Sequence, residues 1–172
     1  QLNVNESVFS GKVDSALFIE AKELNGNLVA DGCNSYIYDY DNNLVGYNGN
    51  QSVYRYDALG RRISNGNTVY CYAGSQMIEE TANGQTSSYT YGNGIDNVLQ
   101  MKRGADSYYF HANHLGSTMA LSGNEGYTVE RVEYDAYGMP SFYDANGMAT
   151  SQSSLGNPIL FTGREYNAEL QN

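Results

Sequence analysis

The chain has 172 residues, of which 41% are hydrophobic, and a formal net charge of −10 at pH 7. The hydrophobic content excludes a wholly disordered chain, because enough apolar surface is present to form a core. The acidic balance argues against nucleic acid or an anionic membrane as the main partner, and no apolar run approaches the ~18 residues of a membrane span.

The residue types favour short strands separated by many turns. There are 17 Tyr, 19 Gly, 2 Pro and no Trp. Tyr suits a half-buried pleated surface, and Gly with Asn supplies the positive φ angles that tight turns need. We therefore expect an all-β fold, an array of antiparallel β-hairpins forming a sheet strip or partial shell.

The first residues, 1–32, differ from the rest of the chain. Residues 15–24 suit either a short helix by propensity or a buried strand by their apolar run, and periodicity does not decide between them. Asn25-Gly26 then signals a turn before a second apolar stretch. We favour a strand over the alternative of one short N-terminal helix.

A Tyr-Asp turn motif recurs from residue 33 onward. In the copy at 54–63, an aromatic strand end leads to Asp57, and Gly60 follows three residues later. Asp accepts hydrogen bonds from backbone groups two residues further on, and Gly takes the left-handed conformation, so each copy predicts a turn. Asn-Gly steps between the copies indicate hairpins. The residues assigned to these turns are Tyr38, Asp39, Tyr56, Asp57, Gly60, Arg61, Tyr134, Asp135, Gly138, Tyr143, Asp144 and Gly147.

Three later segments carry a resemblance to a known family. Residues 109–117 read Tyr-Phe-His-Ala-Asn-His-Leu-Gly-Ser, residues 129–138 contain Tyr-Asp-Ala-Tyr-Gly, and residues 157–165 end in Phe-Thr-Gly-Arg-Glu. In order and spacing they resemble the Rhs repeat-associated core, which follows the Tyr-Asp (YD) repeats of Rhs proteins. The residues that carry this core motif are His111, His114, Leu115, Gly116, Ser117, Gly163, Arg164 and Glu165.

The resemblance implies both an organisation and a role. Residues 33–108 would be YD-type hairpin repeats, and residues 109–172 a truncated core segment. In that family the repeats form a strip that spirals into a shell around a C-terminal toxin, and in several members an aspartate protease in the core cuts the chain. Here Asn167 stands where the protease Asp is expected, and an amide cannot act as a general acid or base. We therefore expect no autoprotease, no catalytic residue, no enzyme activity and no cofactor.

These features together favour a bacterial, secreted or cell-surface structural module without nucleic-acid binding or membrane insertion. A strip of 172 residues is too short to close, and its open edges would pair with other copies into a tube or filament. Two alternatives stay open: a core fragment of a larger Rhs-type toxin shell, and a module that binds glycans or a cell surface. Since the chain starts at Gln1 without Met or a signal peptide, we expect a mature form, a processed piece or a fragment.

Several candidate sites have a structural and a functional interpretation. His111 and His114 could begin a zinc site, but no other ligands are nominated, so we expect no metal. The turn Asp residues could bind calcium, yet no known loop pattern is present and turn capping is favoured. Arg61 is expected to pair with an acidic turn of an adjacent repeat, and Arg164 either supports a carboxylate site or pairs with a turn Asp.

Two cysteines and two asparagines complete the candidates. Cys33 and Cys71 either pair as a disulfide or are small buried hydrophobic residues, and the unpaired state is favoured. Asn5 and Asn50 each begin an Asn-X-Ser pattern for N-glycosylation, which matters only where a glycosylating system meets them.

Overall fold

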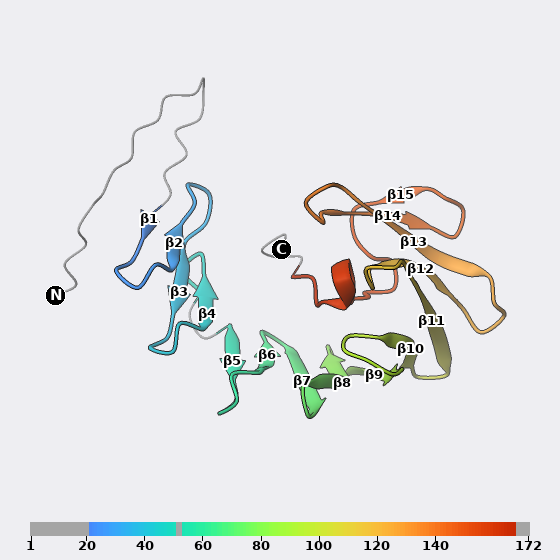
Figure 1. Cartoon of the computed structure of the whole chain (residues 1–172), viewed down its shortest axis with the longest axis horizontal. Coiled ribbons are helices and arrows are strands. Elements are labelled where there is room, and N and C mark those ends of the chain that lie inside the picture. Colours follow the sequence, from blue (N-terminus) through green and yellow to red (C-terminus); the bar gives the residue numbers. More distant parts are fainter. Residues whose placement is uncertain (1–20, 51–52, 168–172) are drawn as a thin grey trace, which may run out of the picture. The chain divides into compact units, whose positions relative to one another are not determined.

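The structure is a computed structural model that describes residues 21–50 and 53–167. The described chain is nearly all β, as expected from the sequence, and its one helical element is a single 3-10 turn, η1 (Phe161–Gly163). The main sheet has 11 antiparallel strands that follow one another in chain order, and two further sheets have 2 strands each (Figure 1).

The chain divides into two compact units, residues 1–70 and residues 71–172. The strands that begin in the first unit are β1 (Ala21–Lys22), β2 (Leu28–Ala30), β3 (Tyr36–Tyr38), β4 (Leu44–Tyr47), β5 (Tyr54–Tyr56), β6 (Arg62–Asn65) and β7 (Thr68–Ala73). The second unit contains β8 (Gln76–Ala82), β9 (Gln85–Tyr91), β10 (Val98–Arg103), β11 (Asp106–Ala112), β12 (Thr118–Ser122), β13 (Thr128–Tyr134), β14 (Pro140–Asp144) and β15 (Ala149–Thr150). The boundaries expected after residues 32 and 108 rest on the repeat pattern and stay a prediction.

The N-terminal apolar stretch lies only partly within the described residues. Ala21–Lys22 and Leu28–Ala30 are paired strands, with the Asn25-Gly26 turn between them. The rest of the stretch at 15–24 lies outside the described residues, so the expected choice between strand and helix is answered only for its last part.

One five-residue turn joins strands at several places in the chain. In the turn at 57–61, Asp57 Oδ1 accepts the backbone N–H groups of Leu59 at 2.9 Å and Arg61 at 3.0 Å. The Gly60 N–H donates to the Asp57 carbonyl oxygen at 3.0 Å, and Gly60 has a φ of 75°, which explains why glycine stands there. The same side-chain pattern is made by Asp39, Asn113, Asp135 and Asp144.

The first unit has a small core built from tyrosine. Tyr54 is almost fully buried, and its ring stacks on Tyr47 with 6.3 Å between the ring centroids. The Arg62 guanidinium lies over the rings of Tyr54 and Tyr70, at 5.3 and 6.0 Å from their centroids. The described residues of this unit are therefore held together by aromatic and cation–π contacts more than by aliphatic packing.

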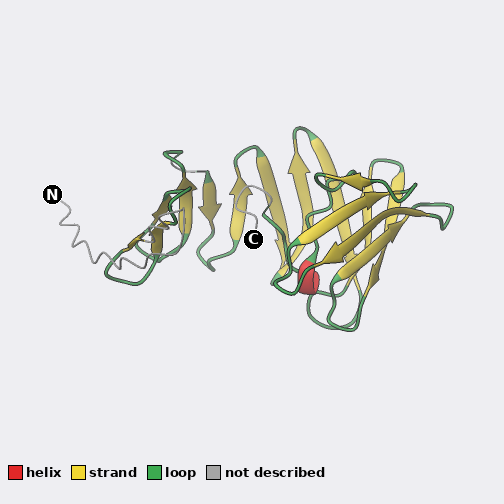
Figure 2. Ribbon diagram, turned by 90° about the horizontal axis from the view of Figure 1, so that it is seen from above, coloured by secondary structure: helices red, strands yellow, loops and turns green. Residues whose placement is uncertain are grey.

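The second unit has a larger apolar core. Its strands follow a curve, and the C-terminal part of the chain lies on the inner side of that curve (Figure 1). Leu160 from this C-terminal part packs against Val132 and Phe142, with Tyr134 and Tyr166 beside them. The single 3-10 turn follows Leu160 directly and lies beside the strands (Figure 2). The C-terminal segment thus completes the core that the strands leave open.

Candidate functional site

Residues 153–167 form a strap across the inner face of the second unit. The Thr118 N–H donates to the Leu160 carbonyl oxygen at 3.1 Å, and the Thr118 hydroxyl donates to the Ile159 carbonyl oxygen at 2.8 Å. The Thr162 N–H donates to the Ser117 hydroxyl oxygen at 2.9 Å. Ser117 and Thr118 are buried, so the strap meets β12 through a fully paired polar seam.

The start of the strap is fixed by a buried carboxylate from β13. Glu130 is 1% exposed, and its carboxylate accepts hydrogen bonds from the Ser153 hydroxyl at 2.9 Å and the Ser154 hydroxyl at 3.0 Å. The backbone N–H groups of Ser154 and Leu155 donate to the same carboxylate at 2.7 and 3.4 Å. A buried carboxylate that accepts this many donors acts as a clamp rather than as a reactive group.

A second buried carboxylate belongs to a network that also reaches the strap. The Tyr89 hydroxyl donates to Glu80 Oε1 at 2.6 Å, and the Arg103 guanidinium lies 3.7 Å from the same oxygen. Arg103 also donates to the Ser87 hydroxyl oxygen at 2.8 Å and to the Leu155 carbonyl oxygen. Burial raises the pKa of Glu80 above its ordinary value, and burial followed by the neighbouring Glu80 charge raises the pKa of Tyr89.

The end of the strap meets the loop between β9 and β10 at a strained point. A Cβ atom on Gly163 would lie 2.5 Å from the Asp96 carbonyl oxygen, and Gly163 has a φ of 73°. Asp96 and Thr162 also have positive φ, 57° and 52°, a conformation that costs energy for residues with side chains. Arg164 Nε lies 3.2 Å from Asp96 Oδ2, and this ion pair joins loop and strap.

Two pockets flank this junction and share Thr162 in their walls. The first, of about 630 Å³, includes His114, Asn93, Asp96 and Asn97 in its lining and is called the His114 pocket. It offers an imidazole and several amides, which can donate or accept hydrogen bonds.

The second pocket, of about 620 Å³, is called the Tyr137 pocket. Besides Tyr137 itself, its lining includes Asp135, Phe161, Glu165 and Tyr166, and so combines aromatic rings with carboxylates.

The structure separates the two histidines that the sequence placed together. His111 in β11 has its Nε2 atom 2.8 Å from the Ser122 hydroxyl oxygen, and His114 lies on the turn at 113–117; both residues are exposed. Within the described ranges, no three His, Cys, Asp or Glu side chains lie where they could hold a metal ion. The described part of the chain also has no helix long and apolar enough to cross a membrane.

Other predicted residues have the following positions. Cys33 and Cys71 are free and exposed, so neither is the buried hydrophobic residue that was considered. Arg61 pairs with Asp57 of its own turn at 2.6 Å, because the five-residue turn brings the two side chains together, and its expected pairing with an adjacent repeat stays a prediction. Asn167, at the expected protease position, is buried. Asn50 is exposed beside β4, and Asn5 lies outside the described residues.

The remaining predicted turn and core-motif residues lie in or next to the turns of their motifs. Tyr38, Tyr56 and Tyr134 each end the strand that leads into a five-residue turn, and Tyr143 precedes Asp144 in β14. The core-motif residues Leu115 and Gly116 lie in the turn at 113–117, next to the buried Ser117. The turn glycines Gly138 and Gly147 both have positive φ.

Sequence reasoning missed the residues that hold the strap, namely Glu80, Tyr89, Arg103 and Glu130. A signal existed for one of them: in β13, Glu130 shares the inner face with Val132 and Tyr134, because alternate residues of a strand point the same way. A carboxylate on an apolar face indicates a buried partner. No comparable signal marks Arg103, whose partner at Leu155 is 52 residues away.

Comparison with known proteins finds a class of RNA-cleaving enzymes, and no family model matches the chain. The similar proteins are the tRNA3(Ser)-specific nuclease WapA of Bacillus spizizenii and the tRNA nuclease WapA of Bacillus subtilis strain 168. A tRNA(Glu)-specific nuclease WapA of Bacillus subtilis subsp. natto also matches. Each is 33% identical over 158 residues, covering 84% of this chain, and the chain spans 6% of the length of these relatives.

These findings overturn several expectations from the sequence. Membership of the Rhs/YD-repeat family is wrong, because no family model matches and the relatives are named as tRNA nucleases. The turn motifs misled because the capping oxygen and the positive φ are demands of turn geometry, which unrelated chains can meet alike.

The expected non-enzymatic structural role, with self-assembly into a tube or filament, is contradicted by the same names, as is the expectation of no enzyme activity. The expectation of no nucleic-acid partner is contradicted by the tRNA in the names of the relatives as well. It rested on a net charge averaged over this chain, which is a small fraction of the length of its relatives.

Proposed function

We propose that this chain is a segment of a tRNA nuclease. The observation that carries the proposal is the 33% identity over 158 residues to proteins named as tRNA nucleases. Because the chain spans only 6% of their length, the proposal concerns the activity of the longer protein to which the segment belongs.

We further propose that the choice of tRNA lies outside this segment. The relatives are named for different tRNAs, one for a serine tRNA and one for a glutamate tRNA, yet both match this chain at 33% identity over 158 residues. A segment that itself selected the tRNA would be expected to resemble one of them more than the other.

A cleavage assay tests the first proposal. The longest protein that contains this chain, and the 172-residue chain alone, would each be incubated with total tRNA, and the products separated on a denaturing gel. We expect discrete tRNA fragments from the longer protein. Intact tRNA after incubation with an active, folded preparation of that protein would contradict the proposal, and fragments from the chain alone would place the chemistry within these residues.

A segment exchange tests the second proposal. The matching 158 residues of the serine-tRNA-specific relative would be replaced by those of this chain. We expect the chimera to keep the tRNA preference of the recipient, and a changed preference would contradict the assignment.

Location outside the cell, at the surface or secreted, stays a prediction that fractionation of producing cells would check.

A further inference from the structure

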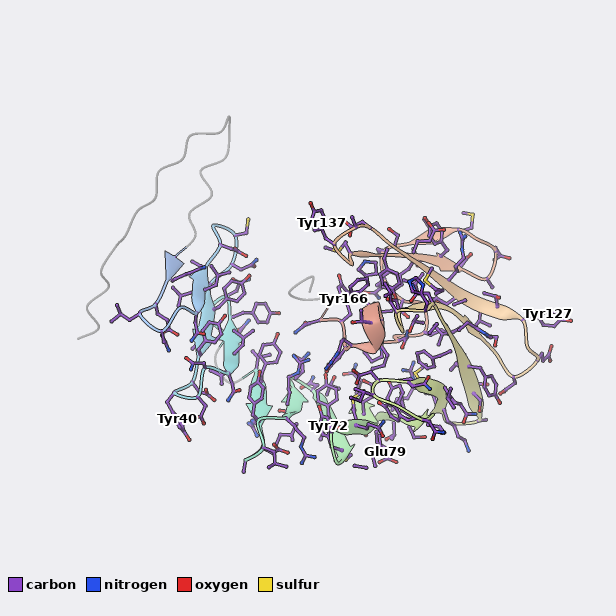
Figure 3. The ribbon with its side chains drawn as sticks, in the orientation of Figure 1. Tyr40, Tyr72, Glu79, Tyr127, Tyr137 and Tyr166 are labelled. Carbon is purple, nitrogen blue, oxygen red and sulfur yellow. The ribbon has the colours of Figure 1, made fainter. Side chains whose placement is uncertain are left out.

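The Tyr137 pocket has aromatic walls from two separate parts of the chain. Tyr137 projects from the turn at 135–139 that joins β13 to β14, and Tyr166 lies on the strap (Figure 3). Phe161 and Met139 complete the apolar lining. Tyr137 is 95% exposed, Met139 41% and Phe161 39%, so these side chains have apolar surface that a ligand would cover.

The back wall of this pocket is fixed by packing. The Phe161 ring lies 5.5 Å from the Tyr134 ring, centroid to centroid, at an interplanar angle of 56°. A Cβ atom at Gly138 would lie 2.9 Å from the Phe161 ring, so a glycine at this position lets the ring approach the turn closely. The Phe161 ring is thus pre-positioned, which lowers the entropy cost of binding against it.

The charges around the pocket are mainly negative. Asp135, Glu165 and Arg164 are all part of the lining, and the Arg164 guanidinium pairs with a third carboxylate, that of Asp96, at 3.2 Å. Asp135 caps its turn through Oδ1 alone, which accepts the N–H groups of Tyr137 at 2.8 Å and Met139 at 3.0 Å.

Aromatic faces attract cations through the ring quadrupole, and adjacent carboxylates add a direct charge interaction. An anionic group such as an RNA phosphate would be repelled by the same carboxylates. We propose that the Tyr137 pocket binds the cationic side chain of an arginine or lysine presented by a basic peptide segment of a partner protein. The inference stands apart from the nuclease proposal, because it rests on this pocket alone.

The chain supplies its own matched control for the charge. Asp144 caps a second turn of the same kind, through Oδ1 to the N–H groups of Asn146 at 2.8 Å and Met148 at 2.9 Å. Asn113 makes this cap with an amide oxygen, so Asp→Asn at either turn preserves the backbone and removes one charge. Met139 and Met148 stand at the same place in the two turns and give equivalent reporters.

The test is a titration of the 172-residue chain, labelled with ¹³C at the methionine methyl groups, with the peptide Gly-Gly-Arg-Gly-Gly, followed by NMR. We expect the Met139 methyl signal to move and the Met148 signal to stay. Asp135→Asn should weaken binding about fivefold, Asp144→Asn should leave it unchanged, and Tyr137→Ser should weaken it by a similar factor to Asp135→Asn. Tyr137 carries no packing in the fold, so its substitution leaves the chain folded.

Three outcomes would overturn the inference. Equal weakening by Asp135→Asn and Asp144→Asn would show that the peptide responds only to the general negative charge of the chain. Equal binding of a peptide with norleucine in place of arginine would show that apolar contact suffices. No movement of the Met139 signal at millimolar peptide would show that the pocket does not bind the side chain at all.

Discussion

At the scale of single residues, the chain reuses one chemical device, an oxygen acceptor at the first position of a five-residue turn. Asp57 and Asn113 both accept two backbone N–H groups, although only the first is charged. What the turn requires is therefore the acceptor and its reach, not the negative charge. For Asp57, the hydrogen bonds from Arg61 come first among the causes that lower the pKa of the carboxyl group below its ordinary value.

Gly163 lies where an added side chain would meet the backbone of the loop between β9 and β10. Gly163→Ala would place a Cβ atom 2.5 Å from the Asp96 carbonyl oxygen at a φ of 73°, whereas Gly104→Ala meets nothing within 4 Å at a φ of 62°. We expect Gly104→Ala to lower the free energy of unfolding by about 1 kcal/mol and Gly163→Ala by about 3 kcal/mol. Urea unfolding measures both, and equal losses would show that the strap and the loop do not touch at this point.

At the scale of elements, the strap is held to the sheet by polar contacts along its length, including those with Ser117 and Thr118, and by an apolar contact at Leu160. Glu130 and Arg103 fix its first residues, Leu160 fills the core, and the Asp96–Arg164 pair holds its end. Removing one buried partner of such a network leaves the other partners unsatisfied, which costs more than the net value of the bonds.

Glu130→Ala tests the first clamp. The change leaves the hydroxyl and N–H donors of Ser153, Ser154 and Leu155 without their acceptor, so we expect a loss of about 3 kcal/mol in the free energy of unfolding. Hydrogen exchange at residues 153–160 should accelerate at the same time. Glu133→Ala on the exposed face of the same strand is the control, with an expected effect below about 0.5 kcal/mol. A similar small effect of Glu130→Ala would refute the clamp.

The buried Glu80 should give the second unit a distinctive pH dependence. Since its folded-state pKa is raised by burial above the ordinary 4.5, the folded state holds the proton more tightly than the unfolded state. Its contribution to stability is therefore complete below pH 4.5 and is lost as the pH rises through the folded-state pKa.

We expect the urea midpoint of the wild-type chain to fall over this pH range more steeply than that of Glu80→Gln, which does not ionise. Parallel profiles for the two proteins would contradict a raised pKa. The pH dependence has the opposite sign for three turn residues, Asp39, Asp57 and Asp144. Hydrogen bonds lower the pKa of these carboxyl groups in the folded state, so their contribution to stability is present at neutral pH and is lost as the pH falls below the range in which Glu80 titrates.

At the scale of the whole molecule, the two units have different cores. In the described residues of the first unit the buried hydrophobic side chains are Tyr54 and Tyr70, while the described residues of the second unit include nine, among them Met101, Leu121 and Val132. Burial of apolar surface is the main source of stability, so the second unit should be the more stable one.

Hydrogen exchange read by mass spectrometry can check this difference. We expect amides of β3 to β6 to exchange at least about tenfold faster than amides of β10 to β13, because local opening costs less where few apolar side chains are buried. Leu160→Ala removes a buried side chain from the core of the second unit and should therefore reduce this difference in exchange rate. Uniform exchange across both units would show that they unfold as one body.

The sequence by itself determined the all-β class and the places of the turns. Tyr-rich strands with Asp and Gly at fixed offsets can form little else, because the capping oxygen and the positive φ are local requirements that neighbouring residues meet together. The motif therefore located Asp57, Asp135 and Asp144 in their turns without any knowledge of the sheet. The same local character explains why the motifs were a poor guide to the family and to its function.

Only the tertiary structure decided which residues form the candidate site. Glu130 and Ser153 lie 23 residues apart, Arg103 and Leu155 52 residues apart, and Asp96 meets Gly163 across a still longer stretch. The strap crosses strands that are remote in sequence, so no periodicity or spacing records these contacts. The Tyr137 pocket arises in the same way, because its rings come from a turn and from the strap and meet only once the core has closed over Leu160.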